Sequence, residues 1–238
     1  MSLSVRQRRI LADMGIPVWR SRIAPAVSDV AAAAPLAEHE AAASATDDTR
    51  ASIALLDWDA LQAQVRTCTA CTELARERTQ TVFGVGDRGA RWLFVGEAPG
   101  AEEDRRGEPF VGRAGQLLDN MLAALGLDRT RDVFIANVLK CRPPGNRDPK
   151  PEEARACRSF LDRQIDLIQP EVIVALGRIA AQGLLESGEP LGRLRGSEHR
   201  YQGVPLIATY HPAYLLRKPG DKARAWQDLQ RARACLRT

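Results

Sequence analysis

RWLFVG, at residues 91–96, is an almost uninterrupted apolar run that leads into the turn EAPG at 97–100. Three similar runs follow along the chain: VFIANV at 133–138, EVIVAL at 171–176 and PLIATY at 205–210. Apolar runs of this length, without polar alternation, are typical of parallel strands that are covered on both faces. We therefore expect four strands in one parallel sheet.

Segments with helical periodicity separate these runs. Apolar residues at i, i+3 and i+4 spacing fill 114–125, and Gly126 ends that stripe. A second stripe at 154–168 is predicted to start at Asp148, and two more helices follow Gly177 and the turn at 219–221. Alternating strands and helices place a parallel sheet between helix layers. We therefore predict an α/β fold, a three-layer α/β/α sandwich with a central four-stranded parallel sheet.

The chain divides into three parts. Residues 1–23 form a basic element with an apolar anchor at Trp19. Residues 24–55 are rich in alanine and have little to bury, so we interpret them as a flexible linker. The main domain is placed at 56–238. It is long enough to bury its own core.

Composition excludes several classes of protein. No apolar run approaches the length of a membrane span, and no signal peptide is recognisable. These observations exclude the membrane, extracellular and collagen-like classes, and we expect a cytoplasmic monomer. The net charge of +4 is compatible with a polyanionic partner.

Distinctive residues gather where three of the predicted strands end. The first strand runs into a glycine-rich acidic turn at 96–104, the second ends near Asn137 and the fourth near His211. Each of these features alone is common in ordinary loops. Ligands of open parallel sheets bind outside the carboxyl ends of the strands, so the three together favour a binding site.

Five cysteines form the second unusual feature. An odd number without an export signal argues against a disulfide framework and favours metal or cluster ligation. Cys68 and Cys71 are spaced as adjacent ligands, and Cys141 and Cys157 complete a set that suits zinc or a [4Fe–4S] cluster. Spacing does not choose between the two, and Cys157 also fits the buried face of a helix. Cys235 is left over as a structural or free thiol.

Longer motifs occur in a fixed order with these cysteines: GEAPGAEED at 96–104, GEPFVGRAGQLLD at 107–119, NVLKCRPPGNRDP at 137–149 and YHPAYLLR at 210–217. Over roughly residues 60–235 they resemble the iron–sulfur uracil-DNA glycosylases called family 4. The resemblance implies the fold of that family and a monofunctional hydrolase of base excision repair that acts on uracil-containing DNA. It also implies that Cys68, Cys71, Cys141 and Cys157 hold a structural [4Fe–4S] cluster.

The resemblance assigns roles around a uracil that is flipped out of DNA. Phe110 would stack on the base, Asn137 would read its edge and Asn146 would assist nearby. His211 would donate a hydrogen bond to O2 as charge develops on the leaving base. A weak base suffices to position the water, for which Glu97 and Glu103 are candidates, with Glu103 preferred.

The first motif departs from that of the better-known uracil glycosylases. Those enzymes have an aspartate and a tyrosine where this chain has Ala98 and Gly100, both of which we place at the uracil site. Water positioning and thymine rejection must therefore come from other residues. In the last motif, Leu215 is predicted to be the wedge that fills the space left by the flipped base. Arg217 and Lys218 suit phosphate contacts, although a solvated helix face has the same composition.

The N-terminal element has a resemblance of its own. RRILADMGIPVWRSR at 8–22 is similar to the N-terminal peptide of the psi subunit of the bacterial polymerase III clamp loader. This likeness implies that residues 1–23 dock the enzyme onto the clamp loader. The alternative is a helix that packs on the main domain or binds DNA nonspecifically.

Two other functions fit the main domain. One is a non-catalytic iron–sulfur DNA-binding or replication-accessory protein, including a variant that traps DNA covalently through His211. The related group that traps DNA has a different first motif and an inserted basic loop, which this chain lacks. The other is a zinc-stabilised DNA-binding module.

Overall fold

The computed structural model describes residues 51–236. The predicted docking element at 1–23 and most of the predicted linker at 24–55 lie outside these residues. Within the described range, no helix is both long and apolar enough to cross a membrane.

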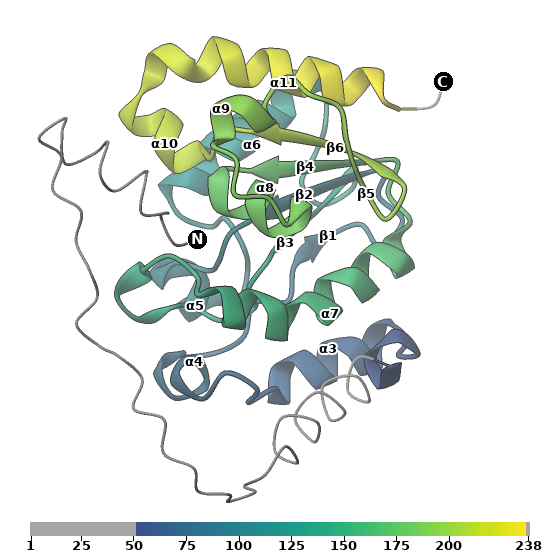
Figure 1. Ribbon diagram of the computed structural model, residues 1–238, viewed down its shortest axis with the longest axis vertical. Helices are drawn as coiled ribbons and strands as arrows, with labels where there is room; N and C mark the ends of the chain where they lie inside the picture. The colour runs from purple at the N-terminus through teal and green to yellow at the C-terminus, as the bar shows by residue number, and fades with distance from the viewer. Residues whose placement is uncertain (1–50, 237–238) are drawn as a thin grey trace, which may run out of the picture. The chain divides into compact units, whose positions relative to one another are not determined.

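Over residues 51–236 the chain forms a six-stranded sheet in the order β1-β3-β2-β4-β6-β5 (Figure 1). Its four inner strands are mutually parallel, and Gly96 pairs with Asn137 where two of them end. These strands are β2 (Trp92–Gly96), β3 (Val133–Asn137), β4 (Val172–Leu176) and β6 (Val204–Thr209). The predicted parallel sheet is therefore confirmed.

Two short edge strands were not predicted. β1 (Val85–Gly86) pairs antiparallel with β3, and β5 (His199–Tyr201) pairs antiparallel with β6. Segments of two or three residues are too short for their hydrophobic alternation to stand out. The sheet is therefore mixed, with a parallel centre and an antiparallel strand at each edge.

Helices cover both faces of the sheet. In chain order they are α3 (Trp58–Thr67), α4 (Thr72–Glu77), α5 (Ala101–Arg106), α6 (Arg113–Leu125), α7 (Pro151–Ile168), α8 (Arg178–Leu185), α9 (Leu191–Leu194), α10 (Pro212–Arg217) and α11 (Lys222–Ala234). Two 3-10 turns, η1 (Pro144–Asn146) and η2 (Pro219–Asp221), lie among them. The N-cap of α7 is Lys150 rather than the predicted Asp148, because the proline at 151 takes the first helical position.

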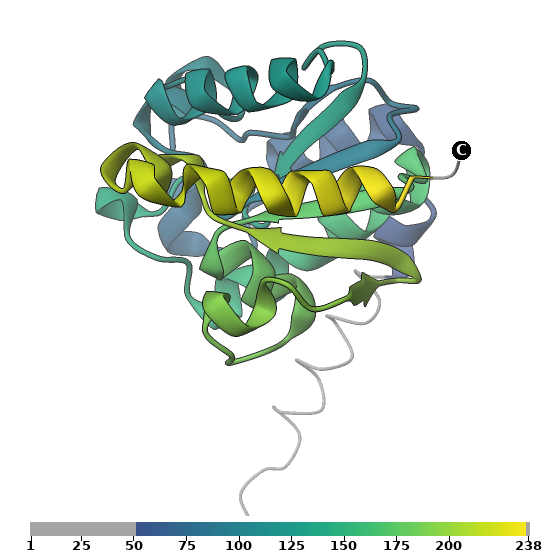
Figure 2. The ribbon, with the colours of Figure 1, turned by 90° about the horizontal axis from the view of Figure 1, so that it is seen from above.

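Two buried clusters show the three layers. On one face, Leu118 of α6 and Leu229 of α11 pack with Phe94 of β2. Figure 2 shows these two helices lying across the sheet. On the other face, Leu161 of α7 and Ala181 of α8 share a cluster with side chains from the opposite side of the strands. The predicted three-layer sandwich is therefore confirmed.

A smaller cluster joins α3 to α7. Leu61 and Val65 of α3 pack against Phe160 of α7 and against Phe83. Ile53 belongs to the same cluster and is only 2% exposed. The folded region therefore begins before the predicted boundary at residue 56.

Candidate active site

The carboxyl ends of the parallel strands meet at one edge of the sheet. β2 ends at Gly96, β3 ends at Asn137, β4 runs directly into Gly177, and His211 lies two residues after β6. The topology therefore brings the three features predicted from the sequence to one place. Gly177, which the sequence analysis did not assign, joins them.

Asn137 and Phe110 both pack closely against Gly96. A β-carbon built on Gly96 would lie 2.4 Å from Asn137 Oδ1 and 2.7 Å from Phe110 Cζ. Both distances are far shorter than van der Waals contact. Any residue larger than glycine would therefore displace these two side chains.

Asn137 carries an unpaired buried acceptor. Asn137 is only 2% exposed. Among the buried side-chain nitrogen and oxygen atoms of residues 51–236, its Oδ1 is the one that has no hydrogen-bond partner. Leaving such an atom unpaired costs about 1–3 kcal/mol. Buried polar atoms in native proteins are normally paired, so this one indicates a binding partner that donates an N–H or O–H group.

Phe110 is the second side chain that packs against Gly96. Its ring centroid lies 5.5 Å from that of His211, and the two ring planes are tilted by 30°. The residue is 6% exposed and has a left-handed backbone with φ of 54°. Aromatic residues rarely adopt this conformation, so the surrounding structure must hold it in place.

His211 is held as a neutral imidazole. It is the N-cap of α10, and its Nδ1 accepts a hydrogen bond from the Ala213 backbone N–H at 3.1 Å. Because Nδ1 is an acceptor, the neutral ring carries its proton on Nε2. Burial, helped by the charge of Arg217, lowers the pKa of His211 to about 4. Gly177 makes room for the ring, since a β-carbon there would lie 2.9 Å from His211 Cβ.

The two candidate carboxylates have different surroundings. Burial, and after it the charge of Asp148, raises the pKa of Glu97. Glu103 accepts hydrogen bonds through Oε1 from the two backbone N–H groups that follow Phe110, at 2.9 and 3.2 Å. Its Oε2 faces Gly100, where a β-carbon would lie 2.7 Å away. Glu103 therefore connects the turn after β2 to the loop that carries Phe110.

Two predicted uracil-site residues have other surroundings. Ala98 packs against a buried cluster that contains Leu139 and Cys141, so it faces the cysteines. Asn146 is exposed in η1, and its Oδ1 accepts a hydrogen bond from Arg142 at 2.8 Å. Among the described residues, no hydrogen bond joins Asn146 to the pocket.

The structure does not support Leu215 as the wedge. Leu215 is 1% exposed and lines an apolar groove with Trp226 and Leu229. A side chain that enters DNA has to be accessible, and the neighbouring Leu216 is 39% exposed. The segment forms the helix α10, which turns Leu215 inward and Leu216 outward. Arg217 and Lys218 follow and are exposed.

The four predicted ligand cysteines line a single cavity together with Arg78 and Lys140. Arg78 Nη1 donates a hydrogen bond to Cys141 Sγ at 2.8 Å, and the Lys140 backbone N–H donates to Cys157 Sγ at 3.3 Å. Hydrogen bonds to a ligand sulfur stabilise its thiolate form and tune the metal that it binds. The surroundings of these sulfurs therefore suit a metal centre.

The electrostatics of this cavity favour a positively charged group between the sulfurs. Burial raises the pKa of Cys71 to about 11 and that of Cys157 to about 12, and neighbouring thiolates add to both effects. The thiolates therefore need positive charge among them. At residues 51–236, no group of His, Cys, Asp or Glu side chains is arranged to hold a single metal ion. Four thiolates form a ligand set that suits either a tetrahedral zinc ion or a [4Fe–4S] cluster.

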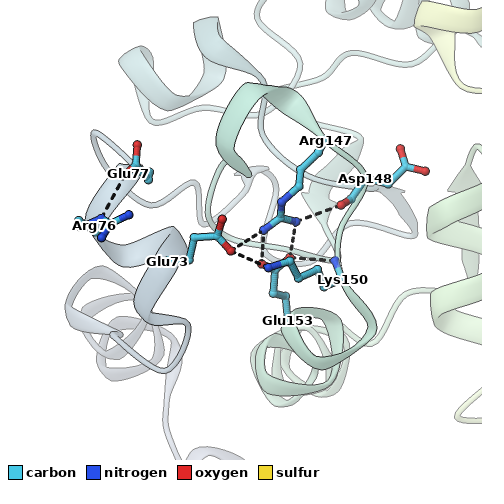
Figure 3. Close-up of polar contacts among 7 residues, drawn as sticks. All are labelled: Glu73, Arg76, Glu77, Arg147, Asp148, Lys150 and Glu153. Carbon is cyan, nitrogen blue, oxygen red and sulfur yellow. Dashed lines mark hydrogen bonds and ion pairs between the residues drawn. The ribbon is translucent and has the colours of Figure 1, made fainter.

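An ion-pair network lies beside this cavity (Figure 3). The Arg147 guanidinium donates to both oxygens of Glu153, at 2.6 and 3.0 Å, and to Glu73 at 3.1 Å. Lys150 Nζ donates to Glu73 at 2.7 Å. Glu73 belongs to α4, whereas the other three belong to the loop before α7 and the start of that helix. The network therefore links the two chain segments that carry the cysteines.

Lys140 is a buried residue that the sequence analysis missed. It is 1% exposed, and its Nζ donates to the backbone oxygen of Asn137 at 3.0 Å, to Phe83 O at 3.3 Å and to Gln164 Oε1 at 2.6 Å. It therefore connects the backbone of Asn137 to the wall of the cysteine cavity. The available signal was a lysine within the otherwise apolar VLKC at 138–141.

A model of the uracil DNA glycosylase superfamily matches residues 83–230, which include all four strand ends. The chain belongs to this superfamily. The glycosylase is 47% identical to the type-4 uracil-DNA glycosylase of Archaeoglobus fulgidus over 169 residues, which cover 68% of this chain and 84% of the relative. It is 44% identical to the type-4 enzyme of Thermotoga maritima, over 73% of this chain and 92% of the relative.

A type-5 uracil-DNA glycosylase from Thermus thermophilus is 32% identical to this glycosylase, over 66% of this chain and 87% of the relative. The identity to the two type-4 relatives is thus higher than to this type-5 relative. The predicted family and enzyme class are therefore confirmed. The chain is a uracil-DNA glycosylase, a hydrolase of base excision repair.

Proposed function

We propose that this glycosylase binds a flipped uracil in the space above Gly96, hydrolyses its N-glycosidic bond and leaves an abasic site. The observation that carries the proposal is the unpaired Oδ1 of Asn137. A base stacked within a duplex cannot reach an atom that is buried this deeply. The nucleotide must therefore leave the helix before it is read.

Asn137 distinguishes uracil from cytosine through its two amide atoms. Oδ1 accepts a hydrogen bond from uracil N3–H, and the amide NH₂ group donates to O4. Cytosine presents an acceptor at N3 and an amine at C4, so both contacts become unfavourable. A buried group left unpaired by the wrong base discriminates strongly against it.

His211 stabilises the leaving base. When the bond between C1′ and N1 breaks, its electron pair moves into the uracil ring and negative charge collects on O2. The Nε2–H of neutral His211 donates to this oxygen, where a fixed donor is most effective. Water oxygen bonds to C1′, and the proton that it loses passes to a carboxylate.

Glu103 is the preferred carboxylate for that water, and Glu97 is the alternative. One oxygen of Glu103 is fixed by two backbone N–H groups, which leaves Oε2 directed toward Gly100 in the first motif. Lys140 is buried behind Asn137, so it is not placed to attack the sugar. That position supports a monofunctional enzyme.

The DNA lies over α10 in this proposal. Arg217 and Lys218 contact phosphates, and Leu216 replaces Leu215 as the wedge, since it is exposed beside them. The charge of Arg217 lowers the pKa of both Glu97 and His211. Arg217 is therefore close enough to the pocket to bind a phosphate beside the flipped nucleotide.

The cysteine cavity holds a [4Fe–4S] cluster in this proposal, with Cys68, Cys71, Cys141 and Cys157 as ligands. A cluster held by these cysteines would cross-link the segment before α4 to the segment around α7. Arg78 and the backbone of Lys140 donate hydrogen bonds to two of the ligand sulfurs. The role of the cluster is structural, since hydrolysis needs no electron transfer.

A labelled duplex with one uracil tests the proposed activity. We expect strand breaks only after alkali treatment. Asn137→Asp should lower uracil excision by at least about 10²-fold. It should also create excision of cytosine, because a protonated aspartate donates to N3 and accepts from the C4 amine.

Asn120→Asp, an exposed substitution on α6, is the matched control and should behave as the wild type. Unchanged uracil excision by Asn137→Asp would contradict the assigned pocket. No excision by folded wild-type protein would favour the non-catalytic DNA-binding function. A DNA adduct that resists SDS would favour covalent trapping through His211.

We also propose that residues 1–23 dock this enzyme onto the polymerase III clamp loader. The support is the similarity of RRILADMGIPVWRSR to the psi-subunit peptide. The alignments with the two type-4 relatives cover 68% and 73% of this chain, so each leaves part of the chain without a counterpart.

A further inference from the structure

We infer that Arg129 is a positioning residue that holds Phe110 in the conformation needed to stack on uracil. The inference rests on the proposed function, because it needs Phe110 to contact the base. Arg129 lies between α6 and β3, outside every motif that the sequence analysis singled out.

The guanidinium of Arg129 holds the backbone of Pro109 and Phe110, in the loop between α5 and α6. Nη1 donates to the backbone oxygen of Phe110 at 3.0 Å, and Nη2 donates to that of Pro109 at 2.8 Å. Nη1 also donates to both carboxylate oxygens of Asp119 on α6, at 3.1 and 3.3 Å. Two neighbouring carbonyls are thus fixed by one planar cation, which is itself anchored to a helix.

Two further contacts hold the same peptide. Glu103 accepts from the two backbone N–H groups after Phe110. The backbone oxygen of Phe110 lies against Gly115, where a β-carbon would be only 1.7 Å away. The left-handed conformation of Phe110 is therefore enforced by groups on both sides. Without the cation, the two carbonyls lose their donor and the residue relaxes toward an ordinary conformation.

Such a relaxation would act on the chemical step rather than on DNA binding. The ring of Phe110 lies over Gly96 and beside His211, so its position sets how the base is presented to the donor on His211. Phosphate contacts elsewhere supply most of the affinity for DNA. A displacement of about 1 Å at the reacting centre can cost about 10²-fold in rate.

Arg129→Met tests the inference, because methionine keeps the apolar stem and removes all the donors. We expect single-turnover excision to fall by about 10²-fold, with the Kd for uracil-containing DNA unchanged within about twofold and weaker inhibition by free uracil. Arg131→Met is the matched control. Arg131 lies two residues away, pairs with Asp132 at the surface and should be replaceable without effect.

The double variant with Phe110→Ala separates positioning from a general structural role. Once the ring is absent, Arg129→Met should cause almost no additional loss of rate. Arg129→Lys should restore little of the lost rate, since one ammonium group cannot donate to both carbonyls and to the carboxylate. If the methionine variant does not fold, as judged by its melting temperature, the lysine variant makes the same comparison.

Three results would overturn the inference. A wild-type rate for Arg129→Met, with a low rate for Phe110→Ala, would reject the positioning role and leave the proposed function intact. If the rate losses of Arg129→Met and Phe110→Ala multiplied in the double variant, Arg129 would act independently of Phe110. A wild-type rate for Phe110→Ala would instead reject the stacking role in the proposed function.

Discussion

His211 is predicted to keep the enzyme active in mild acid. Burial and the charge of Arg217 lower its pKa from 6.5 to about 4, so the neutral form that donates from Nε2 persists far below pH 6.5. We expect the single-turnover rate to fall only as the pH approaches about 4. Arg217→Gln, measured at saturating DNA, should move this acid limb to higher pH, because the nearby positive charge that opposes protonation is gone.

Lys218→Gln is the control, since Lys218 carries the same charge on the next residue and is not among the causes of the low pKa of His211. An acid limb near pH 6.5 in the wild type would show that the imidazole is not held neutral. The low pKa of His211 also makes the folded state less stable in acid. The unfolded chain takes up this proton at a higher pH than the folded one, so acid below pH 6.5 favours unfolding.

Single residues also show where sequence reasoning stops. The meeting of Asn137 and His211 at one edge of the sheet could be predicted, because the ends of parallel strands converge, which is a property of topology. The burial of Leu215 could not be predicted, because the inward or outward direction of one side chain depends on a helix of six residues. The contacts of Lys140 and Arg129 were missed because both residues donate to backbone atoms of other residues, and no sequence motif records such contacts.

At the scale of elements, the ion-pair network of Figure 3 is predicted to hold the cysteine segments together. Glu153 is 5% exposed and depends on Arg147 for its countercharge. Arg147→Met removes the cation that pairs with that carboxylate and leaves Lys150 as the only remaining bridge of this network between the loop before α7 and Glu73 of α4. We expect the visible absorbance of the cluster to be lost about tenfold faster in the presence of an iron chelator.

Arg76→Met provides the comparison for this measurement. Arg76 lies on the same helix, α4, and forms an exposed pair with Glu77, so its loss should leave cluster retention unchanged. If the Arg147→Met variant and the wild type retained the cluster absorbance equally well, the network would not support the cysteines. Zinc in place of iron in the purified wild type would reject the cluster altogether.

The element level was largely predictable. Each inner strand is a run of apolar residues long enough to be recognised, and α6 and α11 have clear boundaries at Gly126 and after the turn at 219–221. The edge strands were missed because pairing partners, rather than their own two or three residues, define them. Ile53 was assigned to the linker because one apolar residue beside an alanine-rich stretch gives no pattern.

At the scale of the whole molecule, docking and catalysis are predicted to be separable. A protein that lacks residues 1–25 should excise uracil from short duplexes at the wild-type rate, because the superfamily match begins at residue 83. The same truncation should abolish binding to purified clamp loader, as measured by surface plasmon resonance. A variant with Trp19→Ala in the full chain isolates the apolar anchor.

Equal binding by the truncated and full-length proteins would remove the docking proposal. A loss of excision on short duplexes would instead indicate that the N-terminal element supports the domain or its contact with DNA. Both measurements use the same preparation, so a general loss of folded protein would be visible in each.

Gly96 has a consequence for how the substrate range of this enzyme can change. Its missing side chain already gives the greatest room that an amino acid can provide at that position, and nothing is left there to trim. A substitution at Gly96 would instead push against Asn137 and Phe110, the two side chains proposed to read and stack on the base. In the proposed site, acceptance of bulkier lesions therefore depends on where that ring and that amide lie, whether the change arises by natural selection or in the laboratory.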